Sequence, residues 1–212
     1  MEVIRKNLGI YGANTYIIFD ENKKAIVIDC GGDSEDVVKI LNENDLTLEA
    51  IVLTHGHFDH IGGVNKLREE TGAKVYGATE ERDLFDDPDH NLSTATLLGP
   101  ITLECDHYFK DGDELEFTPI TLKAKHSPGH TEGSFVLYGN GYLFTGDTLF
   151  KMSCGRTDLY SGNQSKIEDS LKFIATNYPD DTVVCPGHGP QSDIKFEREN
   201  NPYIKNLLWL KS

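Results

Sequence analysis

Two kinds of hydrophobic pattern alternate along the 212 residues of the chain, and each predicts a different secondary structure. Short runs rich in apolar and β-branched residues predict strands, whereas apolar positions at helical spacing predict helices. Runs at 15–19 and 25–28 are separated by the turn residues 20–22, which predicts a β-hairpin. Further strands are predicted at 50–53, 74–76, 121–125, 134–138, 142–144 and 182–185.

Helical spacing follows several of these strand signals. Helices are predicted from Ser34, over 62–70, after the capping box formed by Ser165 and Glu168, and from Pro202. Residues 86–100 have no clean period and predict a long surface loop, a feature that is often functional in a compact protein.

The alternation of strands and helices favours an α+β fold in four layers. We expect a sandwich of two mixed β-sheets packed face to face, with helices on both outer faces, because each half of the chain places a polar residue with metal-binding chemistry after a strand. A chain of 212 residues can bury one substantial core, and its 38% hydrophobic and 26% charged residues are ordinary for a globular protein. We therefore expect a single domain over 1–212.

Composition narrows the class of partner. The net charge of −15 argues against a surface for nucleic acid, because such surfaces usually carry a basic patch. No stretch has the length and apolarity of a membrane span, and the first residues lack the pattern of a secretion signal. The four cysteines form no C-x-x-C pair, which is compatible with a reducing compartment. We expect a cytoplasmic protein acting on a small molecule, with no nucleic-acid or membrane partner.

A dense cluster of metal-binding residue types follows the strand signal at 50–53. It contains His55, His57, Asp59 and His60. His55 and His57 alternate as residues on one side of an extended strand end do, and Asp59 and His60 would lie on the following turn. Such a cluster can direct ligands to two neighbouring positions, which predicts a site for two metal ions.

Further residues with metal-binding chemistry lie downstream. His130, Asp147 and His188 each follow a strand-like segment and a glycine. His90 and His107 stand beside aspartates and are interpreted as ordinary surface or hydrogen-bonded residues. Two other interpretations stay open. His126 is either a packed, hydrogen-bonded residue or a support for a ligand, and Asp29 either forms a turn or accepts a hydrogen bond from a ligand histidine.

These residues resemble those of the metallo-β-lactamase superfamily, whose signature H-x-H-x-D-H corresponds to residues 55–60. The later positions match as well: His130 lies 70 residues after His60, Asp147 lies 17 further on, and His188 another 41. Within the superfamily, the segment 149–158 is most similar to the short glyoxalase II-like (hydroxyacylglutathione hydrolase-like) hydrolases. Only 24 residues follow His188, whereas full-length glyoxalase II enzymes add a C-terminal helical domain that helps to bind glutathione.

The resemblance implies a set of metal ligands and a reaction. His55, His57 and His130 would hold one metal, and Asp59, His60 and His188 the other. Asp147 would bridge the two metals, and the two carboxylates are the expected catalytic residues. Two divalent cations are expected, with zinc as the first choice and iron or manganese as alternatives. A hydroxide held between two cations is available near neutral pH and would attack a thioester carbonyl.

The expected substrate is a (2-hydroxy)acyl thioester such as S-lactoylglutathione or the ester of a related thiol. Arg156, with Lys151 nearby, falls where the family places a basic substrate-binding residue, and an arginine can hold a carboxylate through two parallel hydrogen bonds. A solvated surface arginine is the alternative interpretation. The thiolate leaves without much help from an acid, because a thiol has a pKa of about 8.5.

Three other functions compete with thioester hydrolysis. A lactonase would use the same site, because an ester carbonyl meets hydroxide in the same way. Persulfide dioxygenases of the same superfamily use a single iron and oxygen, and the complete second ligand set argues against that reaction here. The full set of ligand types also argues against a metal-binding protein without catalytic activity. The sequence leaves the oligomeric state undetermined.

Overall fold

The computed structural model describes residues 1–32 and 34–209, and two six-stranded sheets dominate it. The first sheet has the strand order β1-β2-β3-β4-β5-β6, and the second has the order β14-β13-β10-β9-β8-β7. The strands of the first sheet are β1 (Glu2–Leu8), β2 (Ala13–Phe19), β3 (Lys24–Ile28), β4 (Thr47–Val52), β5 (Lys74–Ala78) and β6 (His107–Phe109). Those of the second are β7 (Glu114–Glu116), β8 (Thr121–His126), β9 (Phe135–Gly139), β10 (Tyr142–Gly146), β13 (Val183–Pro186) and β14 (Ser192–Asp193).

Both sheets are mixed, as the sequence predicts. In the first sheet β1, β2 and β3 pair antiparallel, and β3 to β6 pair parallel. In the second sheet β7 to β10 pair antiparallel, β10 pairs parallel with β13, and β13 pairs antiparallel with β14. Parallel neighbours need a long crossover connection, and the crossovers between β3, β4 and β5 run through helices.

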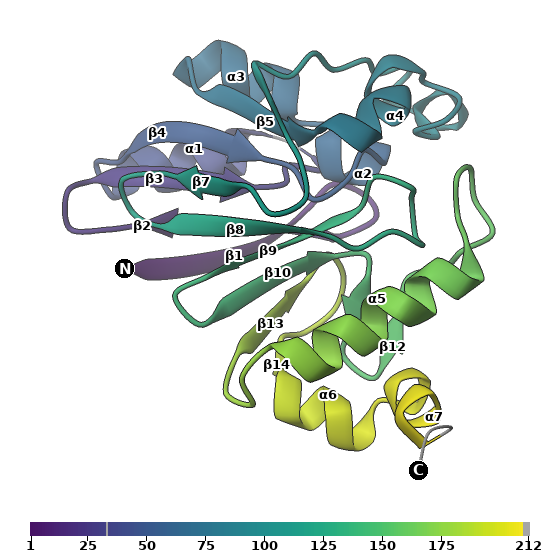
Figure 1. Ribbon diagram of the computed structural model, residues 1–212. Helices are drawn as coiled ribbons and strands as arrows, with labels where there is room; N and C mark the ends of the chain where they lie inside the picture. The colour runs from purple at the N-terminus through teal and green to yellow at the C-terminus, as the bar shows by residue number, and fades with distance from the viewer. Residues whose placement is uncertain (33, 210–212) are drawn as a thin grey trace.

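Helices cover the outer face of each sheet (Figure 1). On the first sheet these include α1 (Ser34–Glu43) and α3 (Val64–Thr71), and the second sheet carries α5 (Gln164–Asn177), α6 (Ile194–Asn200) and α7 (Pro202–Trp209). The short elements are α2 (Phe58–Ile61), α4 (Arg82–Asp86), the 3-10 helices at Thr79–Glu81 and Ser93–Ala95, and the small hairpin of β11 (Leu149–Phe150) with β12 (Ser153–Cys154). The predicted four-layer sandwich is confirmed.

The core is divided between three layers. Alternate residues of a strand point to opposite faces, so Ile17 of β2 packs under the helices while Ile18 packs between the two sheets. The layer between the sheets also contains Val52 and Phe144, which are completely buried. Because both faces of β2 are covered, all seven of its residues are buried. The strands β4 and β10, which precede candidate ligands, are also covered on both faces, because neighbouring residues of each lie in different core layers.

Some local predictions are wrong, for identifiable reasons. The capping box at Ser165 is not formed, because α5 already begins at Gln164. Its N-cap is Asn163, whose side chain accepts a hydrogen bond from the Lys166 N–H. The strand at 182–185 is not the last one, since β14 and α6 follow it. The strand β1 was not predicted because it is an edge strand whose charged residues, including Arg5, face solvent. No helix in the two described ranges is long and apolar enough to cross a membrane.

Candidate metal centre

The cluster of 55–60 begins where β4 ends. The strand stops at Val52, so His55 and His57 lie in the segment after it rather than on the strand end that the sequence predicts. His57 has an extended backbone with φ −64° and ψ 145°, and it immediately precedes α2. Asp59 and His60 lie on that single helical turn. The loop and the helical turn direct four polar side chains to one side of the sheet edge.

The other three candidate residues reach the same edge from the second sheet. His130 lies in the loop between β8 and β9, Asp147 directly follows β10, and His188 follows β13. Because β10 and β13 are parallel neighbours, their carboxyl ends meet at one edge and bring Asp147 and His188 together. The structure thus brings together all seven residues that the sequence singles out.

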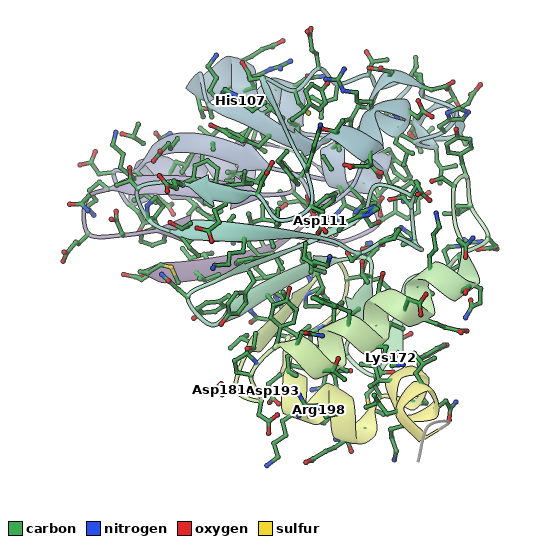
Figure 2. The ribbon with its side chains drawn as sticks, in the orientation of Figure 1. His107, Asp111, Lys172, Asp181, Asp193 and Arg198 are labelled. Carbon is green, nitrogen blue, oxygen red and sulfur yellow. The ribbon has the colours of Figure 1, made fainter. Side chains whose placement is uncertain are left out.

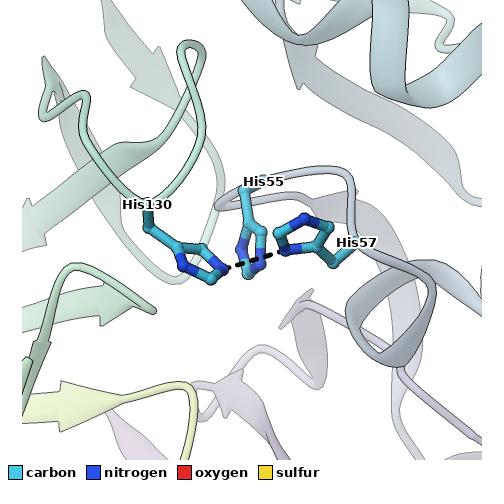
Figure 3. A group of neighbouring side chains, drawn as sticks. All are labelled: His55, His57 and His130. Atoms are coloured by element: carbon cyan, nitrogen blue, oxygen red, sulfur yellow. Dashed lines mark hydrogen bonds between the residues drawn. The ribbon is translucent and has the colours of Figure 1, made fainter. Parts of the chain in front are cut away.

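Three histidines form the first group of converging atoms. One ring nitrogen from each of His55, His57 and His130 lies within 4.8 Å of the other two, and all three side chains are buried. Nδ1 of His57 is 2.9 Å from Nε2 of His130, the contact that Figure 3 marks with a dashed line. His55 comes from the same loop as His57, with its ring centre 5.0 Å from that of each partner. Three imidazoles at this spacing match the donor set of a catalytic zinc site.

A second group lies beside the first. Ligand atoms of Asp59, His60 and His188 also lie within 4.8 Å of one another. Oδ2 of Asp59 is 3.2 Å from Nε2 of His188, and the His60 ring centre is 4.2 Å from that of His55. Two imidazoles and a carboxylate are again ligands that zinc, iron and manganese accept.

Asp147 lies between the two groups. Its Oδ1 is 3.2 Å from Nε2 of His60, and its Oδ2 is 3.5 Å from Nε2 of His188 and 3.6 Å from Nε2 of His130. The backbone at Gly187 approaches closely, because a Cβ there would lie 2.2 Å from Oδ1 of Asp147. The carboxylate therefore lies within reach of members of both groups.

The burial of these atoms tests whether metal ions would suit the site. Within the part of the chain that the structure describes, four buried ligand atoms lack a hydrogen-bond partner: Nε2 of His55, His57 and His60, and Oδ1 of Asp147. A buried polar atom without a partner is costly, whereas a coordinated cation would satisfy it. The residues therefore fit a pair of divalent cations.

The electrostatics of the first group favour neutral imidazoles. Burial lowers the pKa of His57 to about 3 and holds the pKa of His55 well below its ordinary value, with the neighbouring histidines adding to the shift. A histidine binds metal through an unprotonated nitrogen, so both residues are in the form that a cation needs.

In the rest of the site, by contrast, the electrostatics favour the charged forms of the carboxylates and of the histidines that contact them. Burial opposes ionisation of Asp147, yet His60, His130 and His55 together outweigh it and hold the Asp147 pKa well below its usual range. Burial lowers the pKa of His60, but Asp147 and Asp29 raise it well above the ordinary value. For His188 burial likewise lowers the pKa, but the hydrogen bond to Asp59 together with the charges of Asp147 and Asp59 raises it above the ordinary value. These residues form a network of close opposite charges.

Asp29 supports a candidate ligand, which decides between the two interpretations of that residue. Its Oδ2 lies 2.8 Å from Nδ1 of His60 and accepts the Thr54 hydroxyl at 2.7 Å, while its Oδ1 accepts the Thr54 N–H at 2.8 Å. The Thr54 hydroxyl also lies 3.1 Å from Nδ1 of His55. One carboxylate therefore orients His60 directly and His55 through Thr54.

Glu81 is a second supporting residue, and sequence reasoning missed it. It is completely buried, and its Oε1 accepts the Gly56 N–H at 2.8 Å, between His55 and His57. Its Oε2 faces the loop just after His130, where a Cβ on Gly133 would lie 2.3 Å from that oxygen. Glu81 therefore links the two loops that supply the first group of histidines.

The remaining histidines lie outside the candidate centre. For His126 the structure supports the packed, hydrogen-bonded interpretation, because its Nε2 lies 2.7 Å from the Glu132 carbonyl oxygen and its ring contacts Phe135. His107 lies on the edge strand β6 (Figure 2), and its ring stacks on that of Tyr76 from the neighbouring strand β5. His90 stacks on Tyr160 with ring centres 3.6 Å apart.

A cavity of about 440 Å³ opens beside the ligands. Apart from five of the candidate ligands, its lining consists of Tyr11, Phe58, Leu92, Ala95, Thr96, Arg156 and Leu159. The loop 86–100 contributes three of these residues, as the prediction of a functional loop requires. The His130 ring is fixed from this side as well, because its Nδ1 lies 2.8 Å from the Arg156 carbonyl.

The two candidate substrate-binding residues lie in different surroundings. Arg156 lines the cavity, and its guanidinium donates two hydrogen bonds to Asp158 at 2.6 and 2.8 Å. The Lys151 ammonium lies 5.0 Å from the centre of the Phe196 ring, and Lys151 is not part of the described cavity lining. Substrate binding by either residue stays a prediction.

Comparison with known proteins shows what this chain is similar to. It is 33% identical to the "Probable metallo-hydrolase YqgX" of Bacillus subtilis over 96% of this chain and 97% of that protein. It is 31% identical to the "Hydroxyacylglutathione hydrolase GloC" of Haemophilus influenzae over 91% of this chain and 93% of that protein.

Solved structures agree with these relatives. BLEG-1, described as a B3 metallo-beta-lactamase, superposes with a TM-score of 0.89 at 36% identity and covers 96% of this chain and 99% of its own. TTHA1623, solved in a di-iron-bound form, superposes with a TM-score of 0.84 at 29% identity, over 95% and 100%. The family model of the metallo-beta-lactamase superfamily matches residues 8–188, which include all seven candidate ligands. The chain belongs to the metallo-beta-lactamase superfamily.

Proposed function

We propose that this protein is a dinuclear metal-dependent hydrolase that cleaves acyl thioesters, with a (2-hydroxy)acyl thioester such as S-lactoylglutathione, or the ester of a related thiol, as the substrate class. The observation that carries the proposal is the position of Asp147, whose carboxylate contacts members of both groups: Oδ2 lies between His130 and His188, and Oδ1 lies beside His60. A carboxylate so placed can hold two cations close enough to act on one carbonyl group.

When bound, two divalent cations would supply a hydroxide nucleophile at neutral pH and polarise the carbonyl of the substrate. The chain's own residues hold the geometry. His55, His57 and His130 would form one set of ligands, Asp59, His60 and His188 the other, and Asp147 would connect them. Asp29 and Glu81 keep the ligand loops in place, and the cavity beside them admits a small molecule.

A thioester suits this site better than an amide. A thiol with a pKa of about 8.5 departs as thiolate, whereas the amine released from a lactam has to gain a proton. The apolar surfaces of Tyr11, Phe58 and Leu159 along the cavity also suit the apolar sulfur-bearing part of a substrate.

Relatives support the same class. The Haemophilus influenzae relative carries the name hydroxyacylglutathione hydrolase, and the Bacillus subtilis relative that of a probable metallo-hydrolase. Zinc is the metal that we propose, because three imidazoles and shared carboxylates suit it. Iron is the first alternative, since the di-iron form of a similar chain shows that this fold can carry it.

The test is a substrate panel on metal-analysed protein. Thioesters, lactones, persulfides and β-lactams would be compared with and without oxygen. We expect thioester hydrolysis at the highest kcat/KM, unchanged under anaerobic conditions and abolished by a chelator. Oxygen consumption matched to turnover of a persulfide would replace the proposal with a dioxygenase, and preferred lactone cleavage would replace it with a lactonase.

A further inference from the structure

A second cavity of about 390 Å³ lies next to the one at the metal centre. The two cavities share the lining residues Tyr11, Phe58 and Asp59. The rings of Tyr11 and Phe58 meet edge to face with their centres 5.0 Å apart, and so they stand at the boundary between the cavities. The second cavity therefore adjoins the metal centre at Asp59, a candidate ligand that lines both cavities.

The lining of the second cavity is mostly apolar or bare backbone. Leu8, Ile10 and Leu98 line it together with the aromatic pair, and five glycines provide surface without side chains. The glycines cannot easily be replaced, because a Cβ at Gly32 would lie 2.1 Å from the Gly9 nitrogen. Close backbone packing therefore requires glycine at such positions, and this part of the cavity wall is formed by backbone atoms.

Three of its lining side chains are large, apolar and exposed to solvent. Ile10 is 72% exposed, Tyr11 58% and Leu98 53%. They come from two segments far apart in sequence, the turn between β1 and β2 and the loop 86–100. Apolar groups gathered in this way are stabilised when an apolar partner covers them.

The charged groups of the second cavity disfavour an anionic occupant. Asp36 and Asp59 are acidic, and the ammonium of Lys66 lies 3.0 Å from the Glu35 carboxylate. The net charge of −15 acts in the same direction. Arg156 lines only the cavity at the metal centre, so an acidic part of a substrate would bind there instead.

We propose that the second cavity binds an uncharged alkyl or aryl group of the substrate, so that the preferred thioester carries an apolar chain on one side of its carbonyl. This inference rests on the proposed thioester hydrolysis. The apolar group of the substrate belongs either to the acyl part or to the thiol part of the thioester. Both present the same chemistry to Ile10, Tyr11 and Leu98.

Two series of neutral thioesters test the proposal. In one, the acyl group on N-acetylcysteamine grows from acetyl to octanoyl. In the other, acetyl is carried by alkanethiols of increasing length. In one of the two series the growing alkyl group will lie on the side of the carbonyl that faces the second cavity. In that series we expect kcat/KM to rise roughly threefold to fourfold for each methylene that enters the cavity. A rise in either series supports the proposal and identifies the side.

Variants then locate the effect. Leu98→Asp and Ile10→Asp should flatten the dependence on chain length, because each puts a charge where the chain would lie. Leu97→Asp is the matched control: Leu97 is 99% exposed, neighbours Leu98 on the same loop, and is not part of the described lining of either cavity. It should keep the full dependence. If Ile10→Asp fails to fold, the Leu98 and Leu97 pair still decides the result.

Two results would overturn the inference. The first is an active enzyme whose kcat/KM is flat in both series. The second is a chain-length dependence that Leu98→Asp and Leu97→Asp leave equally intact. If no thioester is hydrolysed at all, the proposed function fails. The second cavity is then tested separately, by calorimetric measurement of the binding of the uncleavable thioether S-octyl-N-acetylcysteamine. Binding that Leu98→Asp weakens and Leu97→Asp does not would still support an apolar-chain site, and no binding would remove it.

Discussion

The carboxylate of Asp29 and the Nδ1 atom of His60 lie 2.8 Å apart, and neither is exposed to solvent. Asp29 follows β3, with a left-handed backbone at φ 55°, whereas His60 lies on α2 beyond the next parallel strand. The contact therefore ties together two crossovers of the first sheet. It leaves Nε2 of His60 directed at Asp147.

Replacing Asp29 should weaken the second metal position more than the first. Supporting carboxylates typically contribute tenfold to a hundredfold in metal affinity, because they fix the tautomer and orientation of the ligand histidine. We expect Asp29→Ala to lower the affinity for the second metal by about that factor, measured by competitive titration with a chelator. Asp29→Asn, which still offers an oxygen, should lose less.

The control is Asp181→Asn, an exposed carboxylate remote from the centre (Figure 2). It removes the same charge and should leave both affinities unchanged. Equal affinities in wild type and Asp29→Ala would contradict a role for Asp29 in holding the ligand.

Metal content provides a second test. Because both groups of ligand atoms are complete, we expect about two metal ions per chain by elemental analysis of metal-replete protein. Asp147→Ala removes the carboxylate that faces both groups, so the content should fall and nearly all hydrolysis should be lost. A replete preparation that holds one iron per chain would instead favour the dioxygenase.

Most of the fold was predictable because its strands are buried on two sides. Apart from Thr15, runs such as 15–19 and 50–53 are apolar, and this pattern indicates a buried strand whatever the details of packing. By contrast, β1 is an edge strand with polar exposed positions, and β6 has only three residues, so neither has a pattern that sequence alone could reveal. Helix α5 was predicted, but its first residue depends on a competition between Asn163 and Ser165 that only the folded chain decides.

The candidate ligands were predictable because their chemistry and order are unusual. Glu81 was not, since a single glutamate in a polar stretch, between Glu80 and Arg82, has the appearance of a surface residue. Its burial depends on how the segment after β5 folds over the ligand loops. The pairing of Arg156 with Asp158 was within reach of the sequence, because the two residues are separated by only one position.

Glu81 should make stability depend on pH. Burial raises the pKa of Glu81 to about 7, and the hydrogen bond from the Gly56 N–H only partly opposes this shift. Between the unfolded pKa of about 4.3 and the folded value, the folded chain binds the proton more often than the unfolded chain. The contribution of this group is therefore fully present at low pH and is lost as the pH rises towards and through 7, by up to roughly 3 kcal/mol.

Glu81→Gln removes that titration while keeping an oxygen for the Gly56 N–H. We expect the free energy of unfolding of wild type, relative to Glu81→Gln, to fall as the pH rises from about 4.5 to about 7.5, measured by urea denaturation of both metal-loaded proteins. Glu80→Gln, its exposed neighbour, should follow wild type at each pH. A constant difference between wild type and Glu81→Gln would show that Glu81 does not titrate in this range.

The pair Arg156 and Asp158 gives the sharpest test of substrate charge. Arg156 lines the cavity, but Asp158 occupies two of its five N–H donors, on Nε and Nη2, and the hydrogen bond from Arg156 lowers the pKa of Asp158 to about 2. An anionic substrate that binds the same side of the guanidinium has to displace Asp158. We therefore expect Arg156→Ala to raise KM for acidic thioesters on the order of tenfold, and Asp158→Asn to lower it. Neutral thioesters and metal content should hardly change with either variant.

Two further variants separate recognition from a structural role. If Asp158 acts only by competing for Arg156, Asp158→Asn should have no effect on KM once Arg156 is already alanine. Lys151→Ala should change KM less than Arg156→Ala does, because the Lys151 ammonium lies against Phe196. Equal losses on acidic and neutral substrates in Arg156→Ala, or loss of metal from that variant, would mean that Arg156 serves to hold its loop, whose carbonyl contacts His130, and that the acidic part of the substrate has to be recognised elsewhere.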